Sequence, residues 1–199
     1  MSMYLNDSID RIVWTPLEIS RRVKSLGHEV SRDYQGKELF LVGMLKGSMF
    51  FLADLIRVLS IPVQLDFMFI SSYGASSFMT GVVKIIKDLD ITIENKHVLV
   101  VEDIVDTGLT LGYLLRTLET RSPASLKVCT FLDKPSHRIV EVPLHYIGFE
   151  LDNRFVVGYG LDYQERYRHL PYIATLKREA LKPPENILNE EYSIMEEQS

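Results

Sequence analysis

The sequence predicts an α/β fold with a mainly parallel central sheet flanked by helices. Stretches with strand character alternate with stretches of helical periodicity along most of the chain. Residues 97–101 form a continuous apolar run, typical of a parallel strand buried on both faces. The 199 residues are long enough to bury a core, and 46% hydrophobic with 25% charged residues is ordinary for a globular protein.

The N-terminal third predicts a helix, a strand and a second helix. Thr15 can cap the first helix, and Glu18 completes a capping box. Apolar residues then recur at helical spacing: Ile19, Val23, Leu26 and Val30. A strand at residues 38–45 leads through Lys46 and Gly47 into a helix that Ser48 opens and that runs to about residue 59.

The rest of the chain predicts further strands and one more helix. Alternating apolar residues at 63–69 indicate a strand with one buried face, and a polar loop at 71–81 joins it to a strand at 82–87 in a hairpin. A helix follows the apolar run at 97–101 and ends near residue 121. The remaining expected strands are residues 125–132, 146–151 and 155–157.

Charge divides the chain into a neutral body and an acidic end. The net charge of −5 is accounted for by five glutamates after residue 182, which leave 22 acidic and 22 basic residues in the rest. A charge-balanced body gives no support for nucleic-acid binding. We expect one domain over residues 1–182 and a peripheral acidic tail over residues 183–199.

The sequence disfavours a disulfide, a zinc site, a membrane span and a signal peptide. The single Cys129 cannot form an intramolecular disulfide, and the five histidines show neither an i, i+4 pair nor a cysteine partner for zinc. The apolar runs are too short to cross a bilayer, and the first residues lack the pattern of a signal peptide. We expect a cytoplasmic protein without membrane contact.

Residues 98–110 give the clearest indication of a functional site. A buried strand runs into Glu102 and Asp103, Asp106 follows, and a Thr-Gly-Leu-Thr turn enters a helix. The turn and the helix start offer N–H groups and hydroxyls to a phosphate, while the carboxylates would suit ribose hydroxyls or magnesium. The pattern is neither a P-loop nor a dinucleotide fingerprint. The alternative is a helix whose first-turn acidic residues only stabilise its dipole.

This segment resembles the PRPP-binding motif of the type I phosphoribosyltransferases (PRPP is 5-phosphoribosyl 1-diphosphate). Four other segments, in the same order, resemble the hypoxanthine-guanine branch of that family in its bacterial form. They are Leu45-Lys46-Gly47, Ser72-Tyr73-Gly74, Leu132-Asp133-Lys134, and residues 155–163 with Arg168 beyond. The likeness spans about residues 12–181 and leaves the acidic tail without a role.

The resemblance implies a fold with a small hood made from the N- and C-terminal parts. It also implies purine salvage, in which the 5-phosphoribosyl group of PRPP is transferred to N9 of hypoxanthine or guanine. The products would be IMP or GMP and pyrophosphate. Magnesium is the implied cofactor, PRPP and 6-oxopurine bases are the implied partners, and a homodimer or homotetramer is the implied assembly.

The resemblance also assigns roles to residues of the 98–110 segment. Glu102 and Asp103 would hold the ribose hydroxyls, directly or through magnesium. Asp106 would be the catalytic carboxylate, a general acid/base near N7 of the purine. The ribose 5′-phosphate would be bound by Thr107, Gly108, Leu109 and Thr110.

Other implied roles fall on the remaining segments. Lys46, Gly47 and Arg168 would bind pyrophosphate, at a turn where the family has a non-proline cis peptide. Lys134 would donate to the 6-oxo group, since a lysine has donors only. The other implied purine contacts are stacking by Phe155 and acceptance from a 2-amino group by the carbonyls of Val156 and Asp162. The Asp162 carboxylate would help bind a second magnesium ion, and a mobile loop with Ser72 and Tyr73 would close over the site.

Alternative functions and roles are also compatible with these patterns. Without the resemblance, Lys46 and Arg168 are ordinary surface residues and Phe155 is a core residue. A PRPP-sensing regulator would keep the fold but needs a basic face for nucleic acid. An enzyme for xanthine or adenine is a nearer alternative, because Lys134 disfavours adenine and tolerates xanthine. The balance among hypoxanthine, guanine and xanthine is not fixed.

Overall fold

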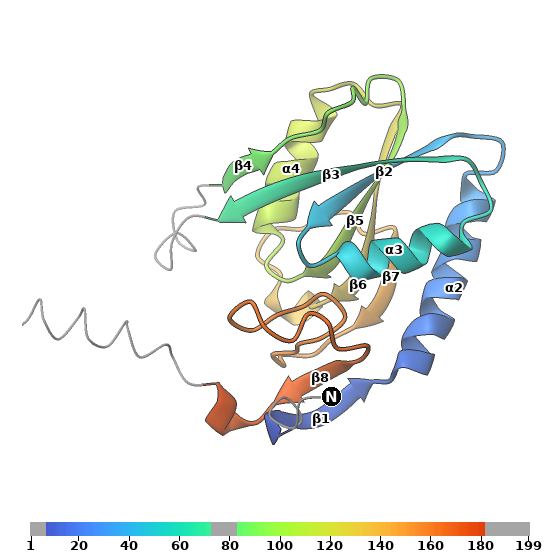
Figure 1. Cartoon of the computed structure of the whole chain (residues 1–199). Coiled ribbons are helices and arrows are strands. Elements are labelled where there is room, and N and C mark those ends of the chain that lie inside the picture. Colours follow the sequence, from blue (N-terminus) through green and yellow to red (C-terminus); the bar gives the residue numbers. More distant parts are fainter. Residues whose placement is uncertain (1–6, 73–82, 182–199) are drawn as a thin grey trace, which may run out of the picture.

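The computed structural model describes residues 7–72 and 83–181 and contains two sheets (Figure 1). The larger sheet has six strands in the order β4-β3-β2-β5-β6-β7, and every neighbouring pair is parallel except β3 with β4. The strands are β2 (Leu39–Leu45), β3 (Val63–Ser72), β4 (Val83–Lys87), β5 (His97–Val105), β6 (Ser125–Asp133) and β7 (Tyr146–Glu150). The expected α/β fold with a mainly parallel sheet is confirmed.

Three α-helices cover the two faces of this sheet. Helices α2 (Pro16–Asp33) and α3 (Met49–Val58) pack on one face, and α4 (Leu109–Glu119) packs on the other (Figure 1). The start of α2 is the expected capping box, in which Glu18 N donates to Thr15 Oγ1 and Thr15 N donates to Glu18 Oε2. Ser48 begins α3 by position, but its hydroxyl donates back to Met44 O instead of capping the helix.

Alternate side chains of the central strands β2 and β5 belong to two apolar cores, one on each face of the larger sheet. Leu41 and Leu99 belong to the core under α2 and α3, whereas their neighbours Phe40 and Val98 belong to the core under α4. Because successive side chains of a strand point to opposite faces, a strand buried on both faces must be apolar throughout. The uninterrupted apolar runs of β2 and β5 satisfy that demand.

A second, two-stranded sheet lies at one end of the molecule (Figure 1). It pairs β1 (Ile9–Trp14) with β8 (Ile173–Leu176) in antiparallel fashion. It therefore joins the N- and C-terminal parts of the described chain, as expected of the hood. Two short 3-10 helices, η1 (Pro135–His137) and η2 (Arg178–Ala180), complete the elements.

One predicted element was wrong, and the structure adds two details that the sequence analysis did not include. The expected strand at residues 155–157 is absent, and Val157 forms an isolated bridge with Ala174. Gly158 follows with φ of +101°, so the backbone turns at once. Strands β1 and β8 were not expected. Strand β5 runs on to Val105, four residues beyond the apolar run, because its pairing with β6 continues through Glu102 and Ile104.

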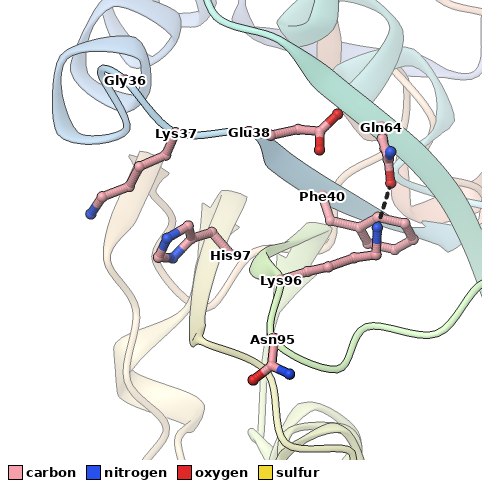
Figure 2. Close-up of a pocket in the computed structure, with 8 residues that line it drawn as sticks. All are labelled: Gly36, Lys37, Glu38, Phe40, Gln64, Asn95, Lys96 and His97. Carbon is pink, nitrogen blue, oxygen red and sulfur yellow. Dashed lines mark hydrogen bonds between the residues drawn. The ribbon is translucent and has the colours of Figure 1, made fainter.

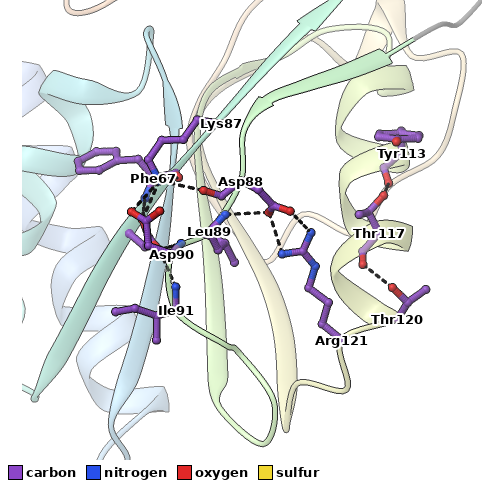
Figure 3. Close-up of polar contacts among 11 residues, drawn as sticks. Phe67, Lys87, Asp88, Leu89, Asp90, Ile91, Tyr113, Thr117, Thr120 and Arg121 are labelled. Atoms are coloured by element: carbon purple, nitrogen blue, oxygen red, sulfur yellow. Dashed lines mark hydrogen bonds and ion pairs between the residues drawn. The ribbon is translucent and has the colours of Figure 1, made fainter.

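Charged contacts hold the segment that links β4 to β5 (Figure 3). The buried Asp66 of β3 accepts from Asp90 N at 2.7 Å and pairs with Lys87 at 3.3 Å. Arg121, just after α4, binds Asp88 through two hydrogen bonds of 2.8 Å. Across residues 7–72 and 83–181, no helix is long and apolar enough to cross a membrane.

Candidate active site

The carboxyl ends of three parallel strands gather most of the predicted site residues. Lys46 and Gly47 follow β2, Glu102 and Asp103 lie in the last part of β5, and Lys134 follows β6. This is the edge at which parallel α/β sheets bind ligands. A cavity of about 510 Å³ lies here. Its lining includes seven of the predicted residues: Lys46, Gly47, Glu102, Asp103, Thr110, Asp162 and Arg168.

Two glycines allow the backbone segments of this cavity to approach closely. A Cβ atom at Gly47 would lie 1.5 Å from Asp103 Oδ2, so any side chain there would collide with the carboxylate. A Cβ atom at Gly160, whose φ is +106°, would lie 1.9 Å from Gly47 O. The turn after β2 is thus pressed between β5 and the 158–168 segment. The cis peptide bond of this turn joins Leu45 to Lys46, one bond before Lys46–Gly47.

Two cations of the cavity are joined by one acidic residue. Lys46 Nζ lies 3.0 Å from Glu165 Oε2, and Arg168 Nη2 lies 3.3 Å from Glu165 Oε1. Arg168 also donates to Gly160 O and pairs with Asp162 at 2.7 Å. In the described part of the chain, its buried Nε atom has no hydrogen-bond partner. The arrangement sets two fixed positive charges beside the carboxylates of β5.

The carboxylates of Glu102 and Asp103 sit in an environment that opposes their charge. Burial raises the pKa of the Asp103 carboxyl to about 6, partly countered by the N–H of Ile104 and by Arg168. Burial and the neighbouring Asp103 raise the pKa of Glu102 as well. A divalent cation would relieve this cost. Magnesium is usually held by one or two carboxylates plus substrate oxygens, and this pair fits that pattern, whereas the described residues hold no cluster of three or more metal-ligating side chains.

A smaller hollow of about 170 Å³ adjoins the start of α4. Its lining includes Glu102, Asp106, Thr107, Gly108 and Thr110. Gly108 precedes α4 with φ of +81°, and a Cβ atom there would lie 2.2 Å from Val140 O. The N-cap residue Gly108 has no side chain, so the N–H groups at the start of this helix receive no bond from an N-cap side chain. Backbone N–H groups of this kind suit a phosphate.

Lys134 reaches the same place from the end of β6. Its Nζ atom lies 3.9 Å from Asp106 Oδ2, and its side chain is only 9% exposed. The Lys134 backbone N–H donates to Val105 O at 2.9 Å, which ties the end of β6 to the end of β5. A buried donor and a carboxylate acceptor therefore lie close together, and the acceptor, Asp106, lines the smaller hollow.

The remaining predicted residues are less closely gathered. Phe155 is 48% exposed, with its ring edge-on to Tyr163 at 5.7 Å, and Val156 is buried; neither lines the two cavities. Leu109 begins α4, and its N–H donates to Thr107 Oγ1 at 3.4 Å. Ser72 is the last residue of β3, and Tyr73 lies outside the described residues, as does the acidic tail.

Sequence reasoning missed three side chains of the site. Glu165 joins Lys46 to Arg168, Arg138 forms a buried ion pair with Asp133, and His137 Nδ1 lies 2.9 Å from Asp106 Oδ1. Glu165 was hidden in a polar run that indicates surface. His137 was missed because its contact with Asp106 depends on the 3-10 turn of η1, and no hydrophobic periodicity in the sequence predicts that turn.

A separate hollow lies at the amino edge of the sheet, beside the starts of β2 and β5 (Figure 2). It has a volume of about 300 Å³, and Lys37, Lys96 and His97 are among its lining residues. The Lys96 ammonium already has partners within the chain, because it donates to Gln64 Oε1 at 2.8 Å and lies over the Phe40 ring. The predicted site residues do not line this hollow, so the predicted chemistry falls on the carboxyl edge alone.

Comparison with known proteins shows the family to which the chain is similar. The model of the phosphoribosyl transferase domain family matches residues 15–164. The chain is 49% identical to a hypoxanthine-guanine phosphoribosyltransferase of Mycobacterium avium, over 84% of this chain and 86% of the relative. The corresponding protein of Bacillus subtilis is 46% identical over 87% and 96%. A crystal structure of a hypoxanthine phosphoribosyltransferase from Staphylococcus aureus aligns with a TM-score of 0.88 and 44% identity, covering 92% of this chain and all of that one.

Proposed function

Because this chain belongs to the phosphoribosyl transferase domain family, and within it to the hypoxanthine-guanine phosphoribosyltransferases, we propose that it makes purine nucleotides by salvage. The reaction transfers the 5-phosphoribosyl group of PRPP to N9 of hypoxanthine or guanine. The products are IMP or GMP and pyrophosphate. The match to the family model, residues 15–164, includes every predicted site residue except Arg168, which supports the same chemistry in this chain.

The observation that carries the proposal is the pair formed by Lys134 and Asp106. The lysine ammonium and the carboxylate lie 3.9 Å apart, and the lysine is nearly buried. A 6-oxopurine offers an acceptor, O6, and a protonated ring nitrogen, N7, on one edge. Lys134 donates to O6 while Asp106 accepts from N7. Adenine presents an amino group instead of O6, and a lysine has no acceptor to meet it.

The chain's residues divide the reaction between them. Asp106 takes or stabilises the N7 proton as N9 attacks the anomeric carbon of PRPP. The bond between that carbon and the pyrophosphate oxygen breaks, and Lys46, the Gly47 backbone and Arg168 hold the leaving group. The 5′-phosphate is bound by Thr107, Gly108, Leu109 and Thr110. Glu165 is the group that pyrophosphate displaces from Lys46 and Arg168.

We include magnesium in the proposal as the cofactor that spreads the charge of the leaving pyrophosphate. Glu102 and Asp103 would hold it together with the ribose hydroxyls, because burial raises the pKa of both carboxyls and a divalent cation would offset that cost. Asp162 would hold a second ion. Its carboxylate lines the same cavity and pairs with Arg168.

The finer expectations stay part of the proposal. Phe155 stacks on the purine, and the carbonyls of Val156 and Asp162 accept from the 2-amino group of guanine. The half-exposed ring of Phe155 leaves room for such a contact. A loop with Ser72 and Tyr73 closes the site. We also propose a cytoplasmic homodimer or homotetramer, which light scattering of the purified protein and cell fractionation would check.

The test is an assay of PRPP with hypoxanthine, guanine, xanthine and adenine, each with and without magnesium. Hypoxanthine and guanine should give their monophosphates only with magnesium. Adenine should react at least about a hundredfold less well, because it leaves buried polar groups unpaired. Comparable turnover of adenine would contradict the role of Lys134, and turnover of no purine base would contradict the function.

A further inference from the structure

We infer that His137 is a positioning residue for the Asp106 carboxylate, an inference that rests on the function proposed above for Asp106. The Nδ1 atom of His137 lies 2.9 Å from Asp106 Oδ1. An ionised carboxylate can only accept, so the ring donates its Nδ1–H to this oxygen. Lys134 lies on the side of the other oxygen, Oδ2, at 3.9 Å. One oxygen is therefore held, and the other faces the lysine that reads the base.

Both contacts come from one short turn of the chain. Lys134 precedes η1 (Pro135–His137), and the His137 N–H donates to Lys134 O at 3.1 Å. This turn fixes the base-reading lysine and the histidine relative to one another. Lys134 N also donates to Val105 O, directly before Asp106. The base donor, the carboxylate and its anchor thus form one rigid group of neighbouring backbone segments.

The fold does not depend on the histidine contact. The side chains of His137 and Asp106 are 33% and 46% exposed, and ion pairs this open to solvent add little stability. The turn is held in other ways. Ile139 N and Val140 N donate to Thr107 O at 2.9 and 3.0 Å, and Arg138 forms a buried ion pair with Asp133. A contact that is dispensable for folding yet aimed at the acid/base group is suited to catalysis.

The physical role is to restrict rotation of the carboxylate. The terminal torsion of an aspartate is soft, so an unanchored carboxylate samples many orientations. A hydrogen bond to Oδ1 leaves Oδ2 turned toward the edge of the base, where the proton of N7 must be received. Small errors of placement at a reacting group cost large factors in rate. His137 should therefore affect turnover more than binding.

Three variants of His137 separate positioning from other effects. His137→Phe keeps a ring and removes the donor. His137→Asn keeps an amide N–H at the place of Nδ1, whereas His137→Gln moves the N–H to the place of Nε2. Ser136→Ala, an exposed neighbour on the same turn, is the control. We expect kcat to fall about tenfold or more in His137→Phe, with little change in KM for PRPP, because hydrogen bonds to charged groups are among the stronger ones. His137→Asn should recover most of the loss, and His137→Gln should not.

A double-mutant cycle with Asp106→Asn separates this inference from the proposed function. If His137 acts through Asp106, His137→Phe should cause little further loss in the Asp106→Asn background. Independent losses that multiply would overturn the inference. A slow Asp106→Asn enzyme together with a normal His137→Phe enzyme would overturn the inference alone. Normal turnover of Asp106→Asn would overturn the role of Asp106 itself. If His137→Phe does not fold, equal kcat values for His137→Asn and His137→Gln would decide against positioning.

Discussion

Two aspartates on parallel strands of the sheet have opposite electrostatic settings. Asp66 of β3 is buried, yet it accepts from Phe67 N, Asp90 N and Lys87, and these bonds outweigh burial and lower its pKa. Asp103 of β5 accepts from Ile104 N at 2.9 Å and from its own N–H, but burial outweighs these bonds and raises its pKa to about 6. The protein supplies enough hydrogen-bond and charge partners to offset the burial of Asp66, but not that of Asp103.

This difference separates a structural carboxylate from a site carboxylate. A buried carboxylate that only supports the fold should find all its partners within the chain, as Asp66 does. Glu102 and Asp103 instead share a cavity with Lys46 and Arg168, where a substrate and its cation would complete the charge balance. The comparison predicts which carboxylates should change activity and which should change stability.

The largest effect should come from Asp106→Asn. Asparagine fits the same turn and leaves in place the backbone that we propose binds the 5′-phosphate, so PRPP and nucleotide binding should change little. Turnover should fall by about 10²–10⁴, the usual range for a positioned acid/base group, with kcat carrying the loss. Steady-state kinetics and thermal unfolding on one preparation check this. Near-normal kcat with unfolding stability lower by about 1 kcal/mol would mean that Asp106 only stabilises its helix.

Asp66→Asn should show the reverse behaviour. The amide nitrogen of asparagine would face backbone N–H groups that now donate to Asp66 Oδ2, those of Asp90 and Ile91. Leaving such buried donors unpaired costs about 1–3 kcal/mol. Urea unfolding should report this loss, while kcat and KM of the folded variant stay close to the wild type. A drop in activity without loss of stability would remove the contrast between the two carboxylates.

The pH dependence of stability should also differ between the two sites. The raised pKa of Asp103 favours folding most below its ordinary value near 4, and this contribution is lost as pH rises to about 6. The lowered pKa of Asp66 contributes above its ordinary value and is lost as pH falls below about 4. Urea midpoints of the unliganded protein across this range should therefore decline less between pH 4 and 6 in Asp103→Asn. An unchanged decline would contradict the raised pKa.

Much of this arrangement could be predicted from the sequence, because it depends on local patterns. The capping box at Thr15 and the apolar run at residues 97–101 each fix an element by themselves. The segments ending in Lys46, Asp103 and Lys134 follow apolar strands, so a parallel sheet must bring them to one edge. The edge of the sheet on which the cavity lies therefore follows from the order of apolar strands and polar residues along the chain.

What could not be predicted depends on partners far away in the chain. β1 is short and largely exposed, β8 has only four residues, and each is a strand only because it pairs with the other. Residues 155–157 carry strand-forming side chains but meet a glycine turn. Glu165 and His137 acquire their places from ion pairs and turns that exist only in the folded chain. No spacing rule connects them to Lys46 or Asp106.

The central claim is that Glu102 and Asp103 bind a substrate together with magnesium, whereas Asp66 only stabilises the fold. Isothermal titration of PRPP, with and without magnesium, tests it most directly in the wild type, in Glu102→Gln with Asp103→Asn, and in Asp66→Asn as the matched control. The wild type and Asp66→Asn should bind PRPP more tightly with magnesium. The double variant should remain folded and lose about tenfold or more of that magnesium-dependent affinity. A folded double variant with an unchanged magnesium dependence would contradict the claim.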